Sequence, residues 1–357
     1  RRPPMDGYAV PMGDAVGARR LEVAGRVAAG ATPGATVGEG RAVWVNTGAP
    51  VPEGTDRVLP VEWCTPLEGG GRVRIDRVPS GSVHVAERAS LLASGEVLLE
   101  AGALLDPAAV GVLATAGRAR VRVGRRPTVA VLGTGTELVD VTETPGPGRI
   151  RNSNTAMLRA QVRRAGATPL DLGVAPDEMD RLVTAVVRGL EADVLVLSGG
   201  VSRGDRDLVP DALAAAGVAR SFHRWAVQPG GPLWFGTADR TLVFGLPGNP
   251  AASFVGFEIL VVPATRALAG GPFAPRGRLR ARYDGPWRGA HPRRRYRPVR
   301  LESEGDGRLA ARTLPWRGSG DPAAFVGVGA LAALPAATPP PLEGAAIVDV
   351  VLLGGMP

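Results

Sequence analysis

The sequence predicts a multidomain α/β plus β protein, in which a central doubly wound α/β domain lies between two β domains in the chain. A length of 357 residues allows roughly two to four domains. Residues 126–272 alternate between short apolar runs and amphipathic runs, which is typical of a parallel sheet with helices on both faces. Residues 1–105 and 273–357 contain short strand-like runs separated by Gly and Pro. We therefore expect domains at these three ranges, with a helical linker at 106–125.

Local patterns define the first two regions. The run RAVWVNTG at 41–48 is typical of a strand and is one of several such runs in the N-terminal domain. The linker begins with a predicted helix at 107–118, which has Pro107 at its start and Gly117 near its end. The segment ARVRVG at 119–124 predicts one further strand.

The central region supplies the alternation of strands and helices. A predicted helix at 153–166 has Ser153 or Asn154 as its expected N-cap and Gly166 at its end. Strands are expected within 127–133, 168–177, 192–200 and 241–250, and further helices at 178–191, 208–217 and 251–268. After residue 275 the pattern is β-type again, which predicts the C-terminal β domain.

Composition excludes several classes of protein. No window reaches the about 18 consecutive apolar residues of a membrane span, so no membrane association is expected. The single cysteine, Cys64, excludes a disulfide framework and favours the cytoplasm. All 42 basic residues are arginine and the net charge is +8, for which coding bias is a simpler explanation than nucleic-acid binding. The most basic tract, at 291–300, lacks an aromatic stacking platform, so nucleic acid is not the expected partner.

Three predicted strands of the central domain end in glycine-rich turns, at 130–138, 194–205 and 243–253. Ligands of open α/β sheets bind beyond the carboxyl ends of the strands, and glycine lets backbone N–H groups approach an anion closely. A ligand that carries phosphate is therefore favoured over three coincidental tight turns. No phosphate-loop motif, G-x-G-x-x-G dinucleotide motif or G-x-S-x-G elbow is present, and the three histidines lack metal-ligand spacing.

Carboxylates occur on or beside these turns at Glu137, Asp205 and Asp207. A few carboxylate oxygens together with substrate phosphates are the ligands that Mg²⁺ prefers. The alternative for Asp205 or Asp207 is a role as the cap of the next helix. The pattern therefore predicts a Mg²⁺ site at this edge of the sheet, with both explanations open for each aspartate alone.

Several motifs of the chain occur in one characteristic order from residue 5 onward. The motifs are MDGYAV (5–10), NTGAPVPEGTDRVLPVE (46–62), GTGTELV (133–139), RNSNTAML (151–158), SGGVSRGDRD (198–207), QPGGPLWFG (228–236), LPGNPAASFVGFE (246–258) and GSG (318–320). With these motifs the sequence resembles the molybdopterin molybdenumtransferase family, the MoeA and gephyrin E-domain group.

The resemblance implies a fold and a reaction. It implies that the central domain is molybdopterin-binding-like, that the C-terminal domain is β-barrel-like, and that 106–125 belongs to an elongated helical domain. Family members begin well before the MDGYA motif, so we expect this chain to be a fragment that lacks the N-terminal part of that domain. The implied reaction inserts molybdate into the dithiolene of adenylylated molybdopterin with the help of Mg²⁺, and AMP leaves. The implied assembly is a homodimer with its active site between subunits, and other cofactor-biosynthesis proteins are candidate partners.

Site residues follow from the motifs one by one. The resemblance implies that acids hold Mg²⁺ or orient the oxyanion, that Thr47 and Ser319 donate hydrogen bonds, and that the glycine-rich turns hold the pterin and phosphate end. The expected catalytic residues are Asp6, Thr47, Glu137, Asp177, Asp207, Arg224 and Ser319, and the expected metal ligands are Glu137, Asp205 and Asp207. The expected cofactor-binding residues are Gly133, Gly135, Ser198, Gly199, Gly200, Ser202, Pro229, Gly230, Pro247, Gly248 and Asn249.

The chain departs from the family pattern at a few positions. Thr136 stands where an aspartate is usual, Gln228 and Gly231 stand where lysines are usual, and residues 82–96 lack a GED triplet. Arg224 occupies a third basic position of the pattern. Three hypotheses follow: an active or weakened transferase, a relative that binds a molybdopterin-type ligand without this catalysis, and a dimeric scaffold for a protein partner. The first predicts that other side chains supply the missing charges.

Overall fold

The computed structural model describes residues 1–15, 19–32, 34, 36–78, 81, 84–201, 207–271, 276–287, 290–305, 307–337 and 346–353. The chain forms two compact units, Arg1–Leu98 and Leu99–Pro357. Each unit has its own hydrophobic clusters, and each is described separately below.

The first unit is built on one six-stranded sheet of order β4-β1-β3-β2-β6-β5. Neighbouring strands are antiparallel except for β2 and β3, which run parallel. The all-β architecture expected for the N-terminal region is present. The strands are β1 (Gly7–Val10), β2 (Arg20–Val27), β3 (Arg41–Val45), β4 (Arg57–Pro60), β5 (Cys64–Leu67) and β6 (Arg72–Ile75), with short 3-10 turns at Met12–Asp14, Val61–Trp63 and Glu68–Gly70.

Alternation along β1 distributes its side chains between two apolar clusters. Tyr8 and Val10 pack with Leu59 in one cluster, and Ala9 packs with Val58 in the other. Successive strand residues point to opposite faces, so β1 is buried on both sides of the sheet. Cys64 lies in the first cluster, and burial raises the pKa of its thiol to about 12. The thiol therefore stays protonated at neutral pH, which does not favour a role as a nucleophile.

The second unit begins with an extended segment and one short helix. Helix α1 spans Pro107–Thr115, with Pro107 at its first position and Asp106 as its N-cap. The Asp106 carboxylate accepts a hydrogen bond of 2.7 Å from the backbone N–H of Ala109. The prediction of a strand at 119–124 is wrong, because no strand of the described residues pairs with this segment. Alternating apolar residues suit a strand only where a sheet edge is available to them.

A six-stranded mixed sheet of order β10-β7-β11-β15-β14-β12 forms the centre of the second unit. The first four strands are parallel, and β14 and β12 complete the sheet as antiparallel edge strands. The central doubly wound α/β domain is therefore confirmed, with an antiparallel edge that the sequence did not predict. The strands are β7 (Thr128–Thr134), β10 (Thr168–Ala175), β11 (Val194–Ser198), β12 (Ala219–His223), β14 (Trp234–Ala238) and β15 (Thr241–Leu246).

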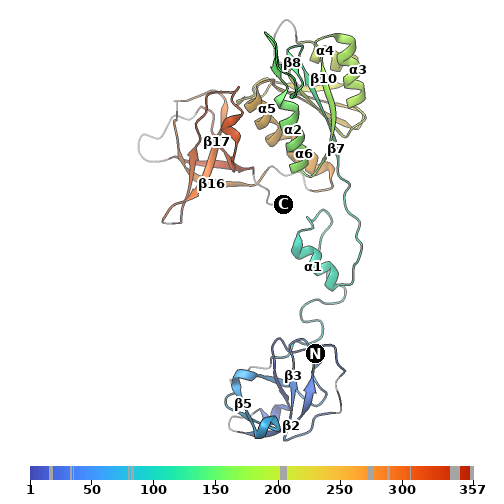
Figure 1. The fold of residues 1–357 in the computed structure, drawn as a ribbon, viewed down its shortest axis with the longest axis vertical. Helices are drawn as coiled ribbons and strands as arrows, with labels where there is room; N and C mark the ends of the chain where they lie inside the picture. Colours follow the sequence, from blue (N-terminus) through green and yellow to red (C-terminus); the bar gives the residue numbers. More distant parts are fainter. Residues whose placement is uncertain are drawn as a thin grey trace. The chain divides into compact units, whose positions relative to one another are not determined.

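Helices cover both faces of this sheet (Figure 1). Val129 and Val131 of β7 face the cluster formed with α2, α6 and the segment before α6, whereas Ala130 and Leu132 face α3 and α4. The order of strands reverses between β7 and β11, and the carboxyl ends beside such a point are where α/β sheets bind ligands. The helices are α2 (Ser153–Arg164), α3 (Met179–Gly189), α4 (Val209–Ala215), α5 (Pro250–Gly256) and α6 (Val262–Leu268).

Two details of these helices differ from expectation. The N-cap of α2 is Asn152, whose side chain accepts from the backbone N–H of Thr155, and not Ser153 or Asn154. The helix expected at 251–268 contains a π-helical turn, Phe257–Val261, between α5 and α6. Pro250–Leu268 is long and apolar enough to cross a membrane by length and composition, but 67% of that stretch is buried in the protein core. Core packing accounts for its apolar character.

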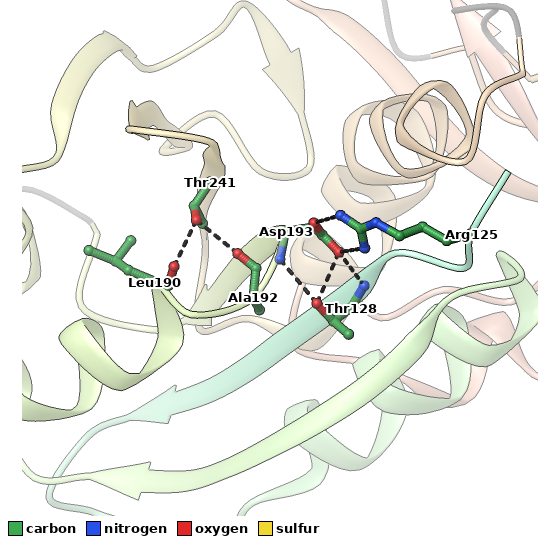
Figure 2. Close-up of polar contacts among 6 residues, drawn as sticks. All are labelled: Arg125, Thr128, Leu190, Ala192, Asp193 and Thr241. Carbon is green, nitrogen blue, oxygen red and sulfur yellow. Dashed lines mark hydrogen bonds and ion pairs between the residues drawn. The ribbon is translucent and has the colours of Figure 1, made fainter.

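The amino ends of the parallel strands are held by a polar network, which Figure 2 shows. Asp193, just before β11, accepts hydrogen bonds from the backbone N–H and the hydroxyl of Thr128, at 2.8 and 3.0 Å. The guanidinium of Arg125 binds both oxygens of the same carboxylate. These bonds, that from Arg125 foremost, hold the pKa of the Asp193 carboxyl well below its usual range. The extended segment that follows α1 is thereby fixed to the start of β7.

The C-terminal region forms a closed β-barrel, as expected from the resemblance. The sheet has the order β13-β17-β18-β16-β20-β19, and pairing of β17 with β19 closes it. Strand β13 comes from within the expected central domain, at 126–272, yet it pairs with β17 of the barrel. The strands are β13 (Val227–Gln228), β16 (Arg278–Asp284), β17 (Arg294–Ser303), β18 (Leu309–Thr313), β19 (Ala330–Leu334) and β20 (Ile347–Leu352); β8 (Leu138–Val139) and β9 (Ile150–Arg151) form a separate pair, and Ala323–Phe325 is a 3-10 turn.

Candidate active-site cleft

A cleft of about 1310 Å³ lies at the carboxyl ends of β7, β11 and β15 within the second unit. One wall comes from the glycine-rich turns of the α/β domain, and the other comes from the barrel. Most of the residues that the sequence implicates in the second unit line it. They are Gly135, Glu137, Asp177, Ser198, Gly199, Gly200, Asp207, Pro229, Gly230, Pro247, Gly248, Asn249 and Ser319.

The turn after β11 requires glycine. Gly199 has a φ of +107°, and a Cβ atom there would lie 2.5 Å from the carbonyl oxygen of Thr134. The absence of a side chain lets the turns after β7 and β11 lie directly against each other. Backbone atoms, rather than side chains, therefore form this part of the cleft surface, as the binding of a phosphate by N–H groups requires.

Asn154 joins two of the turns. Its side-chain Nδ2 donates to the Ser198 hydroxyl at 2.9 Å and to the Gly248 carbonyl at 2.7 Å. This residue was expected only as a helix cap, whereas it lies in the first turn of α2 and also lines the cleft. The signal that could have indicated its role is its place in the RNSNTAML motif, two residues after the true cap at Asn152.

Thr136 and Asp177 bind each other at the rim of the cleft. The Asp177 carboxylate accepts from the backbone N–H and the hydroxyl of Thr136, at 3.2 and 3.3 Å. The backbone N–H of Asp177 lies 3.2 Å from the same hydroxyl oxygen. The threonine that stands in place of the usual aspartate therefore positions the neighbouring acid, and it removes one negative charge from the rim.

Glu137 and Asp207 are the candidate metal ligands that the described part of the chain brings into the cleft. The Glu137 carboxylate folds back over Gly135, so that a Cβ atom at Gly135 would lie 2.5 Å from one of its oxygens. Asp205 and Ser202 lie outside the described residues. Within those residues no three His, Cys, Asp or Glu side chains form a group that could hold a metal on its own. Two carboxylates fit a Mg²⁺ ion whose remaining ligands are substrate oxygens and water.

Two of the implicated residues in the described part of the second unit do not line this cleft. Arg224 is exposed beyond the end of β12, with a φ of +88°. Gly133 is buried within β7, where a Cβ atom would lie 3.1 Å from the side chain of Thr155. Gly133 therefore serves the packing of α2 on the sheet rather than contact with a ligand.

The N-terminal unit brings Asp6 and Thr47 together. Asp6 accepts from the backbone N–H of Thr47 at 2.6 Å and from its hydroxyl at 2.9 Å, and Asn46 donates to the other carboxylate oxygen at 3.3 Å. These bonds, with the backbone N–H of Thr47 foremost, lower the pKa of the Asp6 carboxyl. The Thr47 hydroxyl donates its proton to Asp6, so in this structure it does not offer that proton to an oxyanion.

The barrel contributes basic and aromatic side chains to the second wall. Arg297 lies over the ring of Trp316, with 4.4 Å between its guanidinium carbon and the ring centroid. Arg293 lines the same wall, and the Ser319 carbonyl accepts from the backbone N–H of Ala251 at 3.0 Å. The basic tract at 291–300 is visible in the sequence, but its place in the site could not be predicted, because the register of β17 against β13 is a tertiary feature.

Comparison with known proteins agrees with this architecture. Residues 1–117 match the family described as "MoeA N-terminal region (domain I and II)", and residues 130–267 match that described as "Probable molybdopterin binding domain". A molybdopterin biosynthesis MoeA protein from Pyrococcus horikoshii is 30% identical, with a TM-score of 0.75, and the alignment covers 99% of this chain and 88% of that one. A second structure of the same description and organism is 24% identical, with a TM-score of 0.79 over 98% of this chain and 87% of that one, and supports the fold alone.

Curated relatives of the chain carry the name molybdopterin molybdenumtransferase. The Bacillus subtilis protein is 38% identical over 270 residues, which are 73% of this chain and 63% of that protein. The protein from Staphylococcus aureus strain MRSA252 is 36% identical over 276 residues, which are 75% of this chain and 65% of the relative. The chain thus spans a little under two thirds of these relatives. Through both of its matched regions and its likeness to the Pyrococcus structure, the chain belongs to the MoeA family of molybdopterin biosynthesis proteins.

Proposed function

We propose that the protein inserts molybdate into adenylylated molybdopterin and releases AMP. The observation that carries this proposal is that glycine-rich turns, carboxylates and arginines line one cleft together. Glycine-rich backbone suits a phosphate, carboxylates suit a divalent cation, and arginines suit oxyanions. The curated relatives are named as transferases, which favours catalysis over the binding-only and scaffold hypotheses.

The residues of the cleft divide this work between them. The turns at Gly199 and Gly248, linked through Asn154, would hold the phosphate end of the pterin substrate. Glu137 and Asp207 would hold Mg²⁺, which when bound neutralises phosphate charge and lowers the barrier to departure of AMP. Ser319 lines the cleft from the barrel side, and its hydroxyl would donate a hydrogen bond to an oxyanion. The two walls would orient molybdate and the pterin against each other.

The assembly and the location of the protein are also proposals. The family resemblance supports a homodimer with a shared active site, in which the Asp6–Thr47 pair of the N-terminal unit takes part. The lone buried Cys64 and the arginine-rich composition are compatible with a cytoplasmic protein. Light scattering coupled to size-exclusion chromatography would report a dimeric mass if the first proposal is correct, and a monomeric mass at all concentrations would contradict it.

The test of the function is release of AMP from adenylylated molybdopterin by the purified protein. Release is expected to require both molybdate and Mg²⁺. Asp207→Asn should lower the rate by about 100-fold or more, because the cleft loses a carboxylate. Asp211→Asn makes the same chemical change on the exposed side of α4, outside the cleft, and should stay within about twofold of wild type. Release of AMP at the same rate with and without molybdate would refute the proposal, and so would an Asp207→Asn variant that is as fast as wild type.

A further inference from the structure

A buried carboxylate outside the cleft lies where the α/β domain meets the barrel. Glu258, in the π-helical turn between α5 and α6, is 0% exposed. Its carboxylate accepts a hydrogen bond of 2.6 Å from the side-chain amide of Gln161. It also forms ion pairs with the guanidinium groups of Arg164 and Arg276. Because removal of a carboxylate from water is costly, Glu258 depends on these three partners.

The two arginines come from different domains. Arg164 is the last residue of α2 and, like Glu258, belongs to the α/β domain. Arg276 lies just before β16, at the start of the barrel, and only 5% of its side chain is exposed. Its other terminal nitrogen donates to the carbonyl of Leu353, just after β20, at 3.4 Å. The ion pair with Arg276 therefore crosses from one domain to the other, whereas the ion pair with Arg164 stays within the α/β domain.

The helical stretch that carries Glu258 contacts the barrel side at two further points. At the start of α5 the N–H of Ala251 donates to the carbonyl of Ser319, a residue that lines the cleft, at 3.0 Å. The ring of Phe254 then packs on that of Phe325, with 4.7 Å between the centroids. Glu258 lies about 10 Å further along the helix than Ala251, since the rise is about 1.5 Å per residue. An apolar contact thus lies between two polar ones, one beside the cleft and one away from it.

The apolar contact does not by itself fix how the barrel is oriented. Besides the pairing of β13 with β17, the two domains meet in a cluster where Val255 packs with Tyr296 and Leu331. Hydrophobic contact is non-directional, whereas an arginine–carboxylate pair fixes both distance and angle. Apolar replacements of buried ion pairs often leave stability unchanged or raise it. Orientation therefore accounts better than stability for the pair of Glu258 and Arg276.

We propose that Arg276 is a positioning residue, which through Glu258 fixes the orientation of the barrel on the α/β domain and thereby the width of the cleft. Neither residue is among those that line the cleft. Their effect on the reaction therefore passes through the position of the barrel wall. The expected effect on AMP release rests on the proposed function, whereas the orientation of the barrel does not.

The direct test is the distance between spin labels on the two domains, measured by double electron–electron resonance on the full chain. Labels at Arg188→Cys in α3 and Arg280→Cys in β16 occupy exposed positions, and the buried Cys64 does not compete for them. Arg276→Met should widen the distance distribution by about twofold, because the barrel gains freedom to pivot. Arg164→Met removes a cation from the same carboxylate within one domain and should leave the width unchanged.

The same pair of variants separates positioning from stability in the reaction. Arg276→Met should lower the kcat of molybdate-dependent AMP release by about 10-fold, because the substrate is no longer held between two fixed walls. Arg164→Met should stay within about twofold of wild type. Arg276→Lys keeps the charge and should recover most of the lost rate. Urea midpoints of all three variants, measured in parallel, show that the compared proteins are folded.

A distance distribution of Arg276→Met that coincides with that of wild type would overturn the proposal, and so would equal losses of rate in Arg276→Met and Arg164→Met. If Arg276→Met does not fold, the double variant Glu258→Leu with Arg276→Met takes its place, since it removes both buried charges, and the same results are expected of it. A distribution that widens in a protein without molybdate-dependent AMP release would refute the proposed function and leave the positioning role standing.

Discussion

The two ends of the central parallel sheet use acidic residues in opposite ways. At the amino ends, the Asp193 carboxylate accepts hydrogen bonds from Arg125 and Thr128, and only 17% of its side chain is exposed (Figure 2). At the carboxyl ends, Glu137 lines a large cleft and, among the residues that the structure describes, its carboxylate has no hydrogen-bond partner. A carboxylate beside the end of a strand can therefore serve stability or ligand binding, and its hydrogen-bond partners in the structure decide between the two roles.

The same contrast holds for the neutral side chains. Thr241, at the start of β15, donates to the carbonyls of Leu190 and Ala192 at 2.9 and 2.8 Å and is almost fully buried. The turn after the same strand exposes Gly248 and Asn249 to the cleft instead. One edge of the sheet satisfies its polar groups internally, and the other leaves them for a ligand.

The largest effect is expected for Glu137→Gln at the carboxyl edge. The rate of molybdate-dependent AMP release should fall by about 100-fold, because a candidate Mg²⁺ ligand loses its charge. The free energy of unfolding should change by less than about 0.5 kcal/mol, since the carboxylate makes no hydrogen bond to described residues. Glu191→Gln, an exposed change near the amino edge, serves as the matched control for the rate. An equal loss of rate in both variants would show that the two edges are not separate in function.

The next effect is expected for Asp193→Asn and concerns stability. Loss of the charged network should lower the free energy of unfolding by about 2 kcal/mol at pH 7 in urea titrations. In the folded protein the pKa of the Asp193 carboxyl lies below its unfolded value of about 3.9. The carboxylate therefore contributes its full stabilisation above the unfolded pKa, and this stabilisation is lost as the pH falls toward the folded-state pKa. The gap between wild type and variant should therefore narrow below about pH 4.

Asp349→Asn, on an exposed position of β20, is the control for that measurement. It should leave the free energy of unfolding within about 0.5 kcal/mol of wild type at pH 7. A gap for Asp193→Asn that stays constant from pH 7 to pH 3 would mean that the ionised carboxylate is not the source of the stability.

The smallest effect is expected for Thr241→Val. The carbonyls of Leu190 and Ala192 would lose the single hydroxyl proton that they share inside the protein, which should cost about 1–2 kcal/mol in urea unfolding. Thr184→Val removes a hydroxyl that donates to the Asp180 carbonyl on an exposed helix surface, where water can replace it. If the Thr184 variant loses as much stability as the Thr241 variant, burial does not explain how much the Thr241 hydrogen bonds contribute to the free energy of unfolding.

The sequence predicted the parallel core and its turns because those features depend on local patterns. The run DVLVL became β11, and the turn that follows it lines the cleft as expected. The strand expected at 119–124 does not form, since apolar alternation does not create a sheet edge for it to join. The antiparallel edge of β14 and β12 was missed for the same reason, because pairing is decided by distant residues.

Some residues of the candidate site could likewise be predicted from the sequence, and others could not. Glu137 and Asp207 follow strand ends and could be placed near one another from the order of strands and helices, whereas Asp177 was expected from the family resemblance. Arg293 could not be found in this way, because its position depends on pairing between β13 and β17 and on the space above Gly231. Arg224 was favoured because it occupies a basic position of the family pattern, yet it is not among the residues that line the cleft.

The most direct test of the separation between the two edges is the rate of AMP release by Asp193→Asn, measured below its unfolding temperature with saturating molybdate and Mg²⁺. The amino edge stabilises the sheet without contacting the substrate, so the rate is expected to stay within about twofold of wild type while Glu137→Gln loses about 100-fold. A folded Asp193→Asn protein that loses activity as severely as Glu137→Gln would contradict this account.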